Sequence, residues 1–205
     1  MEPDWLRWVK RLQAIAQDGL TYAEDRYDLG RYEQLRELAA EIMAVHSTGG
    51  LEEARGLLEL EKGPATPKVD VRAAVFGEGG ILLVRESDDG GWSVPGGWAD
   101  VGETAAEGAV REVHEESGYR VRAVRLISAY DRDRQGHTPL PYHVYKLVFL
   151  CEVLDETPAS PVEAAEVGFF GERDLPDLSL SRVTPAQVRR FFEHHRRPEL
   201  PADFD

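Results

Sequence analysis

One short helical segment, TAAEGAVREVHEESG, lies between long strand-like runs and limits most strongly how this chain can fold. Thr104 and Glu107 have the spacing of a capping box, which predicts a helix that begins at Ala105. Gly118 suits its end, because glycine adopts a left-handed backbone conformation without strain. The apolar side chains that can pack against a sheet share one face: Ala106, Ala109, Val110 and Val113.

The same helix carries Glu112, Glu115 and Glu116 within an arc of roughly 100°, where like charges repel by roughly 0.2–0.5 kcal/mol per pair. A solvated acidic face is the plain alternative. The capped start, the apolar face beside it and the glycine-rich stretch SVPGGWADVGE before it favour a metal site instead. Carboxylate oxygens suit Mg²⁺ or Mn²⁺, and the backbone carbonyl of Gly97 could face the same cation.

Short runs with strand character surround this helix. They cover residues 69–76, 81–86, 119–130, 142–153 and 166–170. A last helix is expected from Pro185 to about Arg196, with Thr184 as its N-cap. Many strands around few helices predict a mixed α/β/α domain over residues 69–205.

The first part of the chain has a different texture and predicts a small all-helical domain over residues 1–62, followed by a linker at 63–68. The first expected helix has its apolar residues at spacings of three and four: Trp5, Trp8, Leu12, Ile15 and Ala16. Both tryptophans are expected in a small core. After a polar turn within residues 22–31, a second helix carries Tyr32, Leu35, Leu38, Ala39 and Ile42 on one face, and a third covers 51–60.

Composition excludes several classes of protein. The net charge of −14 and the absence of a Lys/Arg block make long nucleic acid an unsuitable partner. Cys151 is the only cysteine, so neither an intrachain disulfide nor a cysteine-rich zinc site can form. The sequence has no secretory signal and no run near the ~20 apolar residues of a membrane span, so we expect a cytoplasmic protein without membrane contact.

The segment from Gly97 to Tyr119 resembles the Nudix box, a 23-residue pattern of one glycine, a spaced glutamate and an Arg-Glu-aliphatic-x-Glu-Glu-x-Gly core. The matching residues are Gly97, Glu103, Arg111, Glu112, Val113, Glu115, Glu116 and Gly118. Only Tyr119 departs from it, at a position that is aliphatic in the family. The resemblance implies an α/β/α sandwich with a mixed sheet. It also implies hydrolysis of a nucleoside diphosphate linked to another group, X.

By this resemblance, the three clustered glutamates would bind the Mg²⁺ or Mn²⁺ ions, with the Gly97 carbonyl as a further ligand. Glu103 and Arg111 would orient the loop and the metal-binding carboxylates. Divalent cations neutralise a pyrophosphate, lower the pKa of a bound water and stabilise the leaving phosphate. A metal site therefore reconciles an acidic protein with an anionic substrate.

The sequence constrains the identity of the general base less than that of the metal ligands. In the family it is a box glutamate or a residue of a later loop, and Glu163 is the candidate in the loop before the last strand. Glu166 is expected only to begin that strand. His137 and His143 have no partner at metal-ligand spacing and are expected on the surface.

Four further residues are candidates for substrate binding. Arg72 and Arg85 lie on predicted strands and could hold phosphate, although arginines on strands are more often surface residues. Tyr130 and Lys146 could contact base or ribose, but nothing in the sequence fixes their direction.

Outside the box, the chain resembles a bacterial branch with a helical N-terminal domain that includes CDP-choline and ADP-ribose pyrophosphatases. The strings that carry this resemblance are YAEDRYDLGRYEQLRELAAEI, HVYKLVFLCEV and DLPDLSLSRVTPAQV. It implies a homodimer and a small nucleotide substrate. Two alternatives stay open: an enzyme that processes RNA ends, and a catalytically silent nucleotide-sugar sensor. The intact glutamates argue against the sensor.

Overall fold

The structure is a computed structural model, and it describes residues 2–154 and 166–205. The chain divides into two compact units, which are described separately. The first comprises Met1–Pro67 together with Pro139–His143, and the second comprises Lys68–Thr138 and Val144–Asp205. The division between Pro67 and Lys68 lies within the predicted linker.

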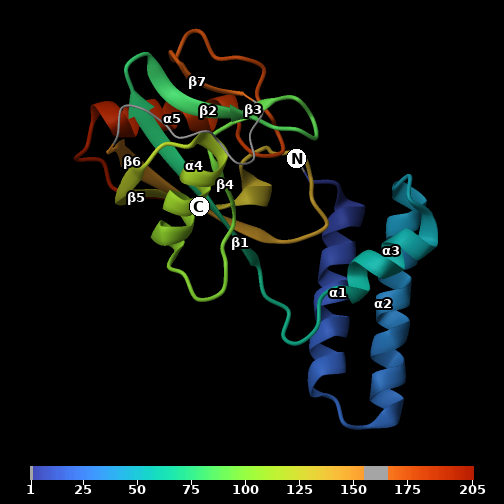
Figure 1. The fold of residues 1–205 in the computed structure, drawn as a ribbon. Helices are drawn as coiled ribbons and strands as arrows, with labels where there is room; N and C mark the ends of the chain where they lie inside the picture. Colours follow the sequence, from blue (N-terminus) through green and yellow to red (C-terminus); the bar gives the residue numbers. More distant parts are fainter. Residues whose placement is uncertain (1, 155–165) are drawn as a thin grey trace. The chain divides into compact units, whose positions relative to one another are not determined.

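The first unit contains three helices, α1 (Asp4–Tyr22), α2 (Arg26–His46) and α3 (Gly50–Glu59) (Figure 1). α2 packs against both α1 and α3. The buried side chains of this small core are Val9, Ala39, Ala40, Met43, Ala54 and Leu58. In the described ranges, no helix of the chain has the length and apolar character needed to cross a membrane.

The single apolar stripe predicted for α1 is wrong, because the structure divides its residues between two faces. Trp5 packs on the core and stacks on His46, with ring centroids 4.7 Å apart. Trp8 and Ile15 are instead exposed to solvent. Each precedes a buried residue, Val9 or Ala16, by one position, which turns its side chain about 100° away from the core.

The turn between α1 and α2 is shorter than the sequence predicted. Asp25 caps α2 by accepting hydrogen bonds from the backbone N–H groups of Tyr27 and Asp28, at 2.8 and 3.2 Å. Because a capping aspartate satisfies the first free N–H groups, the helix begins at Arg26 rather than near Tyr32.

The second unit is built on a mixed sheet in the order β3-β2-β1-β6-β5-β8, in which β4 also pairs with β1 and β7 with β2. The strands are β1 (Lys68–Gly77), β2 (Gly80–Arg85), β3 (Trp92–Ser93), β4 (Gly96–Trp98), β5 (Val121–Asp131), β6 (Val144–Val153), β7 (Val167–Phe170) and β8 (Asp203–Phe204). β1 and β6 run parallel, whereas β1–β2, β1–β4 and β5–β6 are antiparallel.

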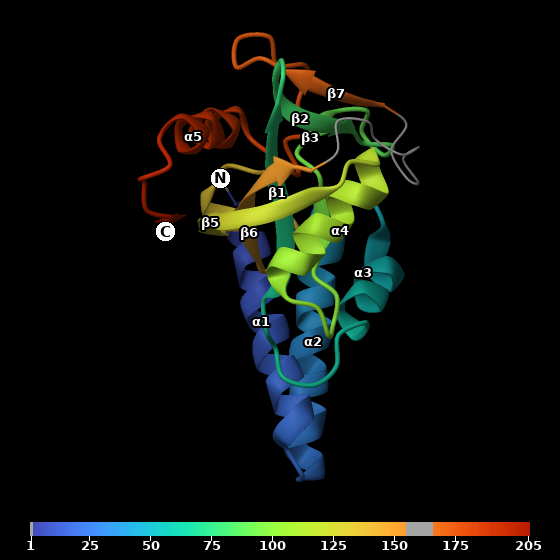
Figure 2. The same cartoon turned by 60° about the vertical axis from the view of Figure 1, so that its left-hand side comes forward.

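Helices cover both faces of this sheet, so the expected α/β/α sandwich is confirmed (Figures 1 and 2). Alternating residues of β1 serve the two layers. Val71 and Val75 pack with Val113 of α4 (Ala105–Ser117), while Ala74 packs with Phe191 of α5 (Pro185–Arg196). The helix α4, which carries the clustered glutamates, is therefore held in place by one of the two hydrophobic cores.

The far side of β5 is largely an open strand edge. Among the described residues, β8 pairs with this strand only at Ser128 and Ala129. The pairing of β5 with β6 shifts register twice, between Ala123 and Arg125 and again between Leu126 and Ser128. Such irregularities bend a strand and interrupt its regular array of hydrogen-bonding groups.

Candidate active site

The ends of α4 are those that the sequence predicts. Thr104 and Glu107 form a reciprocal capping box, in which the Glu107 N–H donates to Thr104 Oγ1 at 3.2 Å and the Thr104 N–H donates to Glu107 Oε2 at 2.8 Å. Gly118 ends the helix with φ of 74°, a left-handed conformation that favours glycine. The acidic face between them is thus held in a well-defined helix.

Arg111 lies at the centre of the acidic residues. Its guanidinium donates to both Glu103 oxygens, at 3.1 Å from Nε and 3.0 Å from Nη2. Nη1 donates to Glu112 Oε1 at 3.0 Å and to Glu115 Oε2 at 2.8 Å. One side chain therefore binds three carboxylates and reduces the repulsion between two of them.

The glycine-rich loop closes on the same helix. The Gly96 N–H donates to Glu116 Oε2 at 3.0 Å. A Cβ atom at Gly97 would lie only 2.8 Å from Glu112 Oε1, so a larger residue there would displace this carboxylate. Gly97 is aligned by β4, where it pairs with Val71 of β1. The structure thus brings Gly97 and the box glutamates together.

Burial shapes the electrostatics of this cluster. It raises the pKa of Glu116 to about 7, against the opposing effects of the Arg72 charge and the Gly96 N–H. Burial also raises the pKa of Glu112, although Arg111 opposes it. In contrast, the hydrogen bonds from Arg111 lower the pKa of Glu103. The positive charges near Glu112 and Glu116 therefore do not offset the burial of these two carboxylates.

This donor set fits a hard divalent cation. Within the described part of the chain, the only hydrogen bond to the Glu116 carboxylate comes from the Gly96 backbone. A half-buried carboxylate without a bonded cation is unfavourable at neutral pH, and Mg²⁺ or Mn²⁺ would supply the missing charge. Glu112, Glu115 and the Gly97 carbonyl are the further oxygen donors nearby.

Arg72 and Lys146 meet in a buried ion network on the face of the sheet that α5 covers. Asp70 accepts from Arg72 Nε at 2.8 Å and from Lys146 Nζ at 3.0 Å. Arg72 Nη1 also donates to the Val94 carbonyl at 3.2 Å, and Lys146 also donates to the Arg182 carbonyl. The structure therefore places both residues inside the fold, where burial lowers the pKa of Lys146 to about 8.

The other sequence-predicted residues lie apart from the acidic cluster. Arg85 is exposed and pairs at 2.6 Å with Glu166, which directly precedes β7 rather than beginning it. The Tyr130 hydroxyl donates to Asp203 Oδ2 at 3.2 Å. Glu163 lies outside the described residues.

The prediction that His137 lies on the surface is wrong, whereas His143 is exposed as expected. His137 is buried, and its Nδ1 lies 3.0 Å from the Leu180 carbonyl. Burial and the nearby Lys146 charge lower the pKa of His137 to about 3, so its imidazole is neutral in the folded protein.

Sequence reasoning missed a second set of charged residues beside the cluster. Glu86 accepts from Ser93 Oγ at 2.5 Å and from Arg182 Nε at 3.0 Å, and its charge contributes to the raised pKa of Glu116. Arg182 also binds Asp88 at 3.0 Å. The only sequence signal for Glu86 is its position at the end of a strand, since its partner Arg182 lies almost a hundred residues away.

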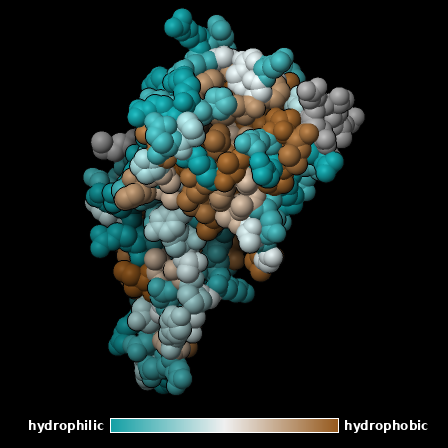
Figure 3. All heavy atoms as spheres, turned by 90° about the vertical axis from the view of Figure 1, so that its left-hand side faces the viewer, coloured by the Kyte–Doolittle hydropathy of each residue, from teal (hydrophilic) through white to brown (hydrophobic). Residues whose placement is uncertain are grey.

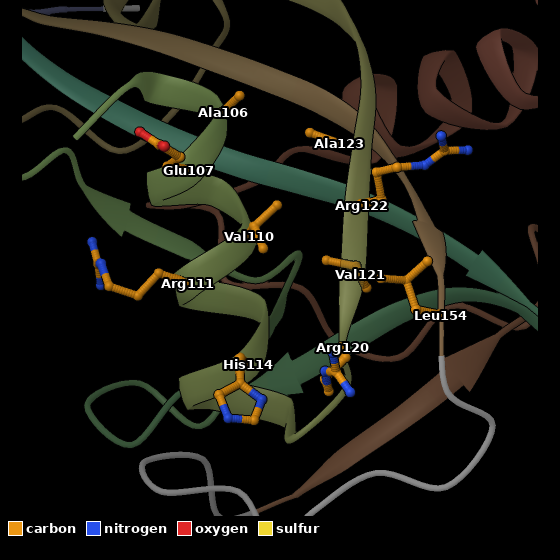
Figure 4. A pocket seen from close by; sticks show the side chains of 10 residues that line it. All are labelled: Ala106, Glu107, Val110, Arg111, His114, Arg120, Val121, Arg122, Ala123 and Leu154. Carbon is orange, nitrogen blue, oxygen red and sulfur yellow. The ribbon is translucent and has the colours of Figure 1, made fainter.

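A pocket of about 660 Å³ lies between α4 and β5, on a different flank of the helix from Glu112 and Glu116. Figure 4 shows Val110 and Val121 pointing toward one another across it, while Arg111 points away. Figure 3 shows apolar side chains gathered on the second unit, on the side where α4 and β5 lie. This largely apolar hollow therefore lies beside the acidic cluster, with Arg111 between them.

Comparison with known proteins identifies the family. Residues 66–192 match the model of the NUDIX domain, and residues 3–58 match a model described as a UDP-X-like, N-terminal oligomerisation domain. The chain is 43% identical over 205 residues to a putative ADP-ribose pyrophosphatase, YjhB, of Bacillus subtilis. That alignment covers all of this chain and 99% of the relative.

Two crystal structures are also similar. An ADP-ribose pyrophosphatase from Streptococcus suis is 39% identical with a TM-score of 0.62, covering 68% of this chain and 100% of that one. A UDP-X diphosphatase is 31% identical with a TM-score of 0.62, covering 98% and 97%. The box residues, the sandwich fold and these similarities lead to one conclusion: the chain belongs to the Nudix hydrolase family.

Proposed function

We propose that this enzyme hydrolyses the pyrophosphate bond of a nucleoside diphosphate linked to a second group, with ADP-ribose as the first candidate substrate. Water would add to one phosphorus and the bridging oxygen would leave with the other, giving AMP and ribose 5-phosphate. The observation that carries the proposal is the set of box glutamates held by Arg111 next to Gly96 and Gly97.

ADP-ribose is favoured over CDP-choline by the names of two relatives, the putative ADP-ribose pyrophosphatase of Bacillus subtilis and the ADP-ribose pyrophosphatase of Streptococcus suis. A UDP-linked substrate is a second candidate, because the UDP-X diphosphatase is similar along both units of the chain. CDP-choline, which would give CMP and phosphocholine, rests on the sequence resemblance alone. RNA-end processing and a silent sensor have no comparable support.

In this proposal, Glu112, Glu115, Glu116 and the Gly97 carbonyl hold Mg²⁺ or Mn²⁺. When bound, the cation would neutralise the pyrophosphate, activate water and stabilise the leaving phosphate. The chain's own groups prepare the site. Arg111 holds two of the carboxylates and is itself held by Glu103, so the ligands keep one arrangement before substrate arrives.

Substrate contacts are proposed for the remaining candidates. Arg72 is the strongest, because its charge acts directly on Glu116 and would also attract a phosphate. Lys146 adds a second buried positive charge in the same network. Arg85 and Tyr130 are weaker candidates, since both lie apart from the acidic cluster. Glu163 remains the proposed general base.

The decisive experiment incubates the full chain with Mg²⁺ or Mn²⁺ and separate substrates. The panel is ADP-ribose, CDP-choline, a UDP-sugar, NADH, diadenosine polyphosphates and 8-oxo-dGTP, with nucleotide products resolved by chromatography. We expect AMP from ADP-ribose at the highest kcat/KM. Faster release of UMP or CMP would select one of the other substrates, and no turnover of any would contradict the proposal.

Glu116→Gln tests the assignment of the metal ligands. Removing one carboxylate should lower kcat by roughly 10²–10⁴-fold and weaken Mn²⁺ binding measured by calorimetry, while circular dichroism stays unchanged. Glu41→Gln, at an exposed position of α2, is the matched control and should leave both quantities unchanged. Near-normal activity of Glu116→Gln would show that the ligand assignment is wrong.

We also propose that the chain forms a homodimer. The supporting observation is the match of residues 3–58 to a model described as an oligomerisation domain.

A further inference from the structure

Trp98 is a large apolar side chain that lies next to the acidic cluster and is 49% exposed. It directly follows Gly97 and ends β4, the short strand that packs against α4 (Figure 1). It belongs to none of the hydrophobic cores that the described residues form. An exposed indole adds little to the stability of a fold, because only buried apolar surface is removed from water. Its flat surface is therefore available to a ligand.

Strand geometry fixes the face of the sheet on which Trp98 lies. Successive side chains of a strand point to opposite faces. A Cβ atom at Gly97 would lie 2.8 Å from Glu112 Oε1, so position 97 faces α4 and its glutamates. Trp98 therefore points to the other face. There it lies directly opposite Asp70 of β1, and residues opposite each other in an antiparallel pair share a face.

The same face carries Arg72, the residue proposed above to attract a phosphate. Arg72 is two residues from Asp70 along β1 and binds it at 2.8 Å. A Cβ atom at Gly96 would lie 2.7 Å from Arg72 Cδ, and the Gly96 N–H donates to Glu116 at 3.0 Å. Arg72 is therefore close both to the strand that carries Trp98 and to a box carboxylate.

A second positive charge lies over the indole. Lys68 Nζ is 6.0 Å from the centroid of the Trp98 ring, at the outer limit of a cation–π contact. In a chain with a net charge of −14, this local positive charge favours an anionic ligand over a neutral one. Aromatic rings beside positive charges are the combination on which proteins stack the bases of single-stranded nucleic acids.

We propose that Trp98 is the surface on which the nucleobase of the substrate stacks. This inference rests on the proposed function. With the pyrophosphate at the box glutamates and one phosphate near Arg72, the base lies one ribose away, and the side chain next to Gly97 can span that gap. Trp98 then positions the substrate without touching the reacting phosphorus. Stacking accepts every base, because every base has a π face, so Trp98 contributes affinity rather than a choice between adenine, uracil and cytosine.

Steady-state kinetics of the full chain with Mg²⁺ test the proposal, using the substrate that the wild type hydrolyses fastest. Trp98→Ala should raise KM by roughly 10–100-fold and leave kcat within about threefold, since stacking holds substrate and transition state alike. Trp98→Phe keeps an aromatic ring and should recover most of the affinity. Phe204→Ala is the matched control, because this aromatic residue is 80% exposed but lies on β8, three strands away from β1.

Intrinsic fluorescence separates stacking from a merely structural role of Trp98. AMP, UMP and CMP are titrated separately into the full chain, and ribose 5-phosphate is the probe that has a phosphate but no base. The three nucleotides should quench the indole emission of the wild type, and ribose 5-phosphate should not. In Trp98→Phe the quenching should be lost. Circular dichroism checks that each variant folds, and the Phe variant decides the question if Trp98→Ala unfolds.

Two results would overturn the stacking role. One is an unchanged KM in folded Trp98→Ala, and the other is quenching by nucleotides that persists in Trp98→Phe. Failure of the wild type to hydrolyse any substrate of the panel would instead contradict the proposed function. The fluorescence titration would still show whether a nucleobase stacks on Trp98, so the two failures are distinguishable.

Discussion

Arg111 shows how a single side chain makes a repulsive cluster tolerable. A planar guanidinium has five N–H donors in a fixed arrangement, which lets it bind several carboxylates at once. Here it binds Glu103 with two hydrogen bonds and still reaches Glu112 and Glu115. The negative charge that Arg111 does not neutralise is concentrated at Glu116, next to the backbone of Gly96.

Arg111→Lys should therefore impair the enzyme even though it keeps the positive charge. A lysine ammonium cannot reproduce the paired contacts to Glu103 while holding the helix carboxylates. We expect roughly 10–100-fold lower kcat/KM and weaker Mn²⁺ binding by calorimetry. Arg122→Lys, in an exposed pair with Glu152, is the control. Equal activity of both variants would remove Arg111 from the site.

His137 gives the protein a defined sensitivity to acid. Its pKa is lowered from 6.5 to about 3 by burial, so the folded state binds fewer protons than the unfolded state between these values. Its contribution to stability is therefore complete above pH 6.5 and is lost as the pH falls toward 3. Between pH 7.5 and 5 this loss is about 2 kcal/mol.

His137→Gln should flatten that part of the pH dependence, because glutamine can still donate to the Leu180 carbonyl but does not titrate. Urea unfolding at pH 7.5 and pH 5 measures the difference. His143→Gln, at an exposed histidine, should keep the slope of the wild type. An unchanged slope in His137→Gln would show that the buried imidazole does not govern acid stability.

At the scale of elements, local signals were sufficient where a few adjacent residues decide the structure. The ends of α4 and the start of α5 follow from capping boxes at Thr104 and Thr184, and both were predicted. The short strands β3, β4 and β8 were not, because two or three residues have no detectable periodicity and form only by pairing with distant segments. The orientation of α1 failed for a related reason: only tertiary packing decides which of its apolar faces is buried.

The last strand, β8, is held to α5 and β5 through one carboxylate. Asp203 accepts from Arg190 Nε and Nη2, both at 2.7 Å, and contacts the buried His194 at 2.9 Å. The Arg190 and His194 contacts lower the pKa of Asp203 to about 2. This group therefore stabilises the fold fully above pH 3.8, and its contribution is lost as the pH falls through 2.

Asp203→Asn should destabilise the second unit by about 2–3 kcal/mol at pH 7, because Arg190 and His194 lose their charged acceptor. Thermal unfolding followed by near-ultraviolet circular dichroism measures this loss. Asp177→Asn, at an exposed aspartate, should stay within about 0.5 kcal/mol of the wild type. An equally small effect at Asp203 would mean that β8 is anchored by other contacts.

For the whole molecule, the sequence predicted the class of fold and the centre of the site but not the support around it. The box residues are close in sequence, so their spacing alone assembles them on one helix. The pairing of Asp70 with Lys146 and of Glu86 with Arg182 joins segments that are far apart along the chain. No pattern within a single sequence encodes such pairs, and Glu163 remains a prediction.

The open edge of β5 has a consequence for behaviour in concentrated solution. An exposed, regular strand edge invites a neighbouring molecule to extend the sheet, which is a common route to aggregation. The two register shifts at Ala123–Arg125 and Leu126–Ser128 make this edge a poor template for such growth. They therefore discourage uncontrolled polymerisation through the sheet.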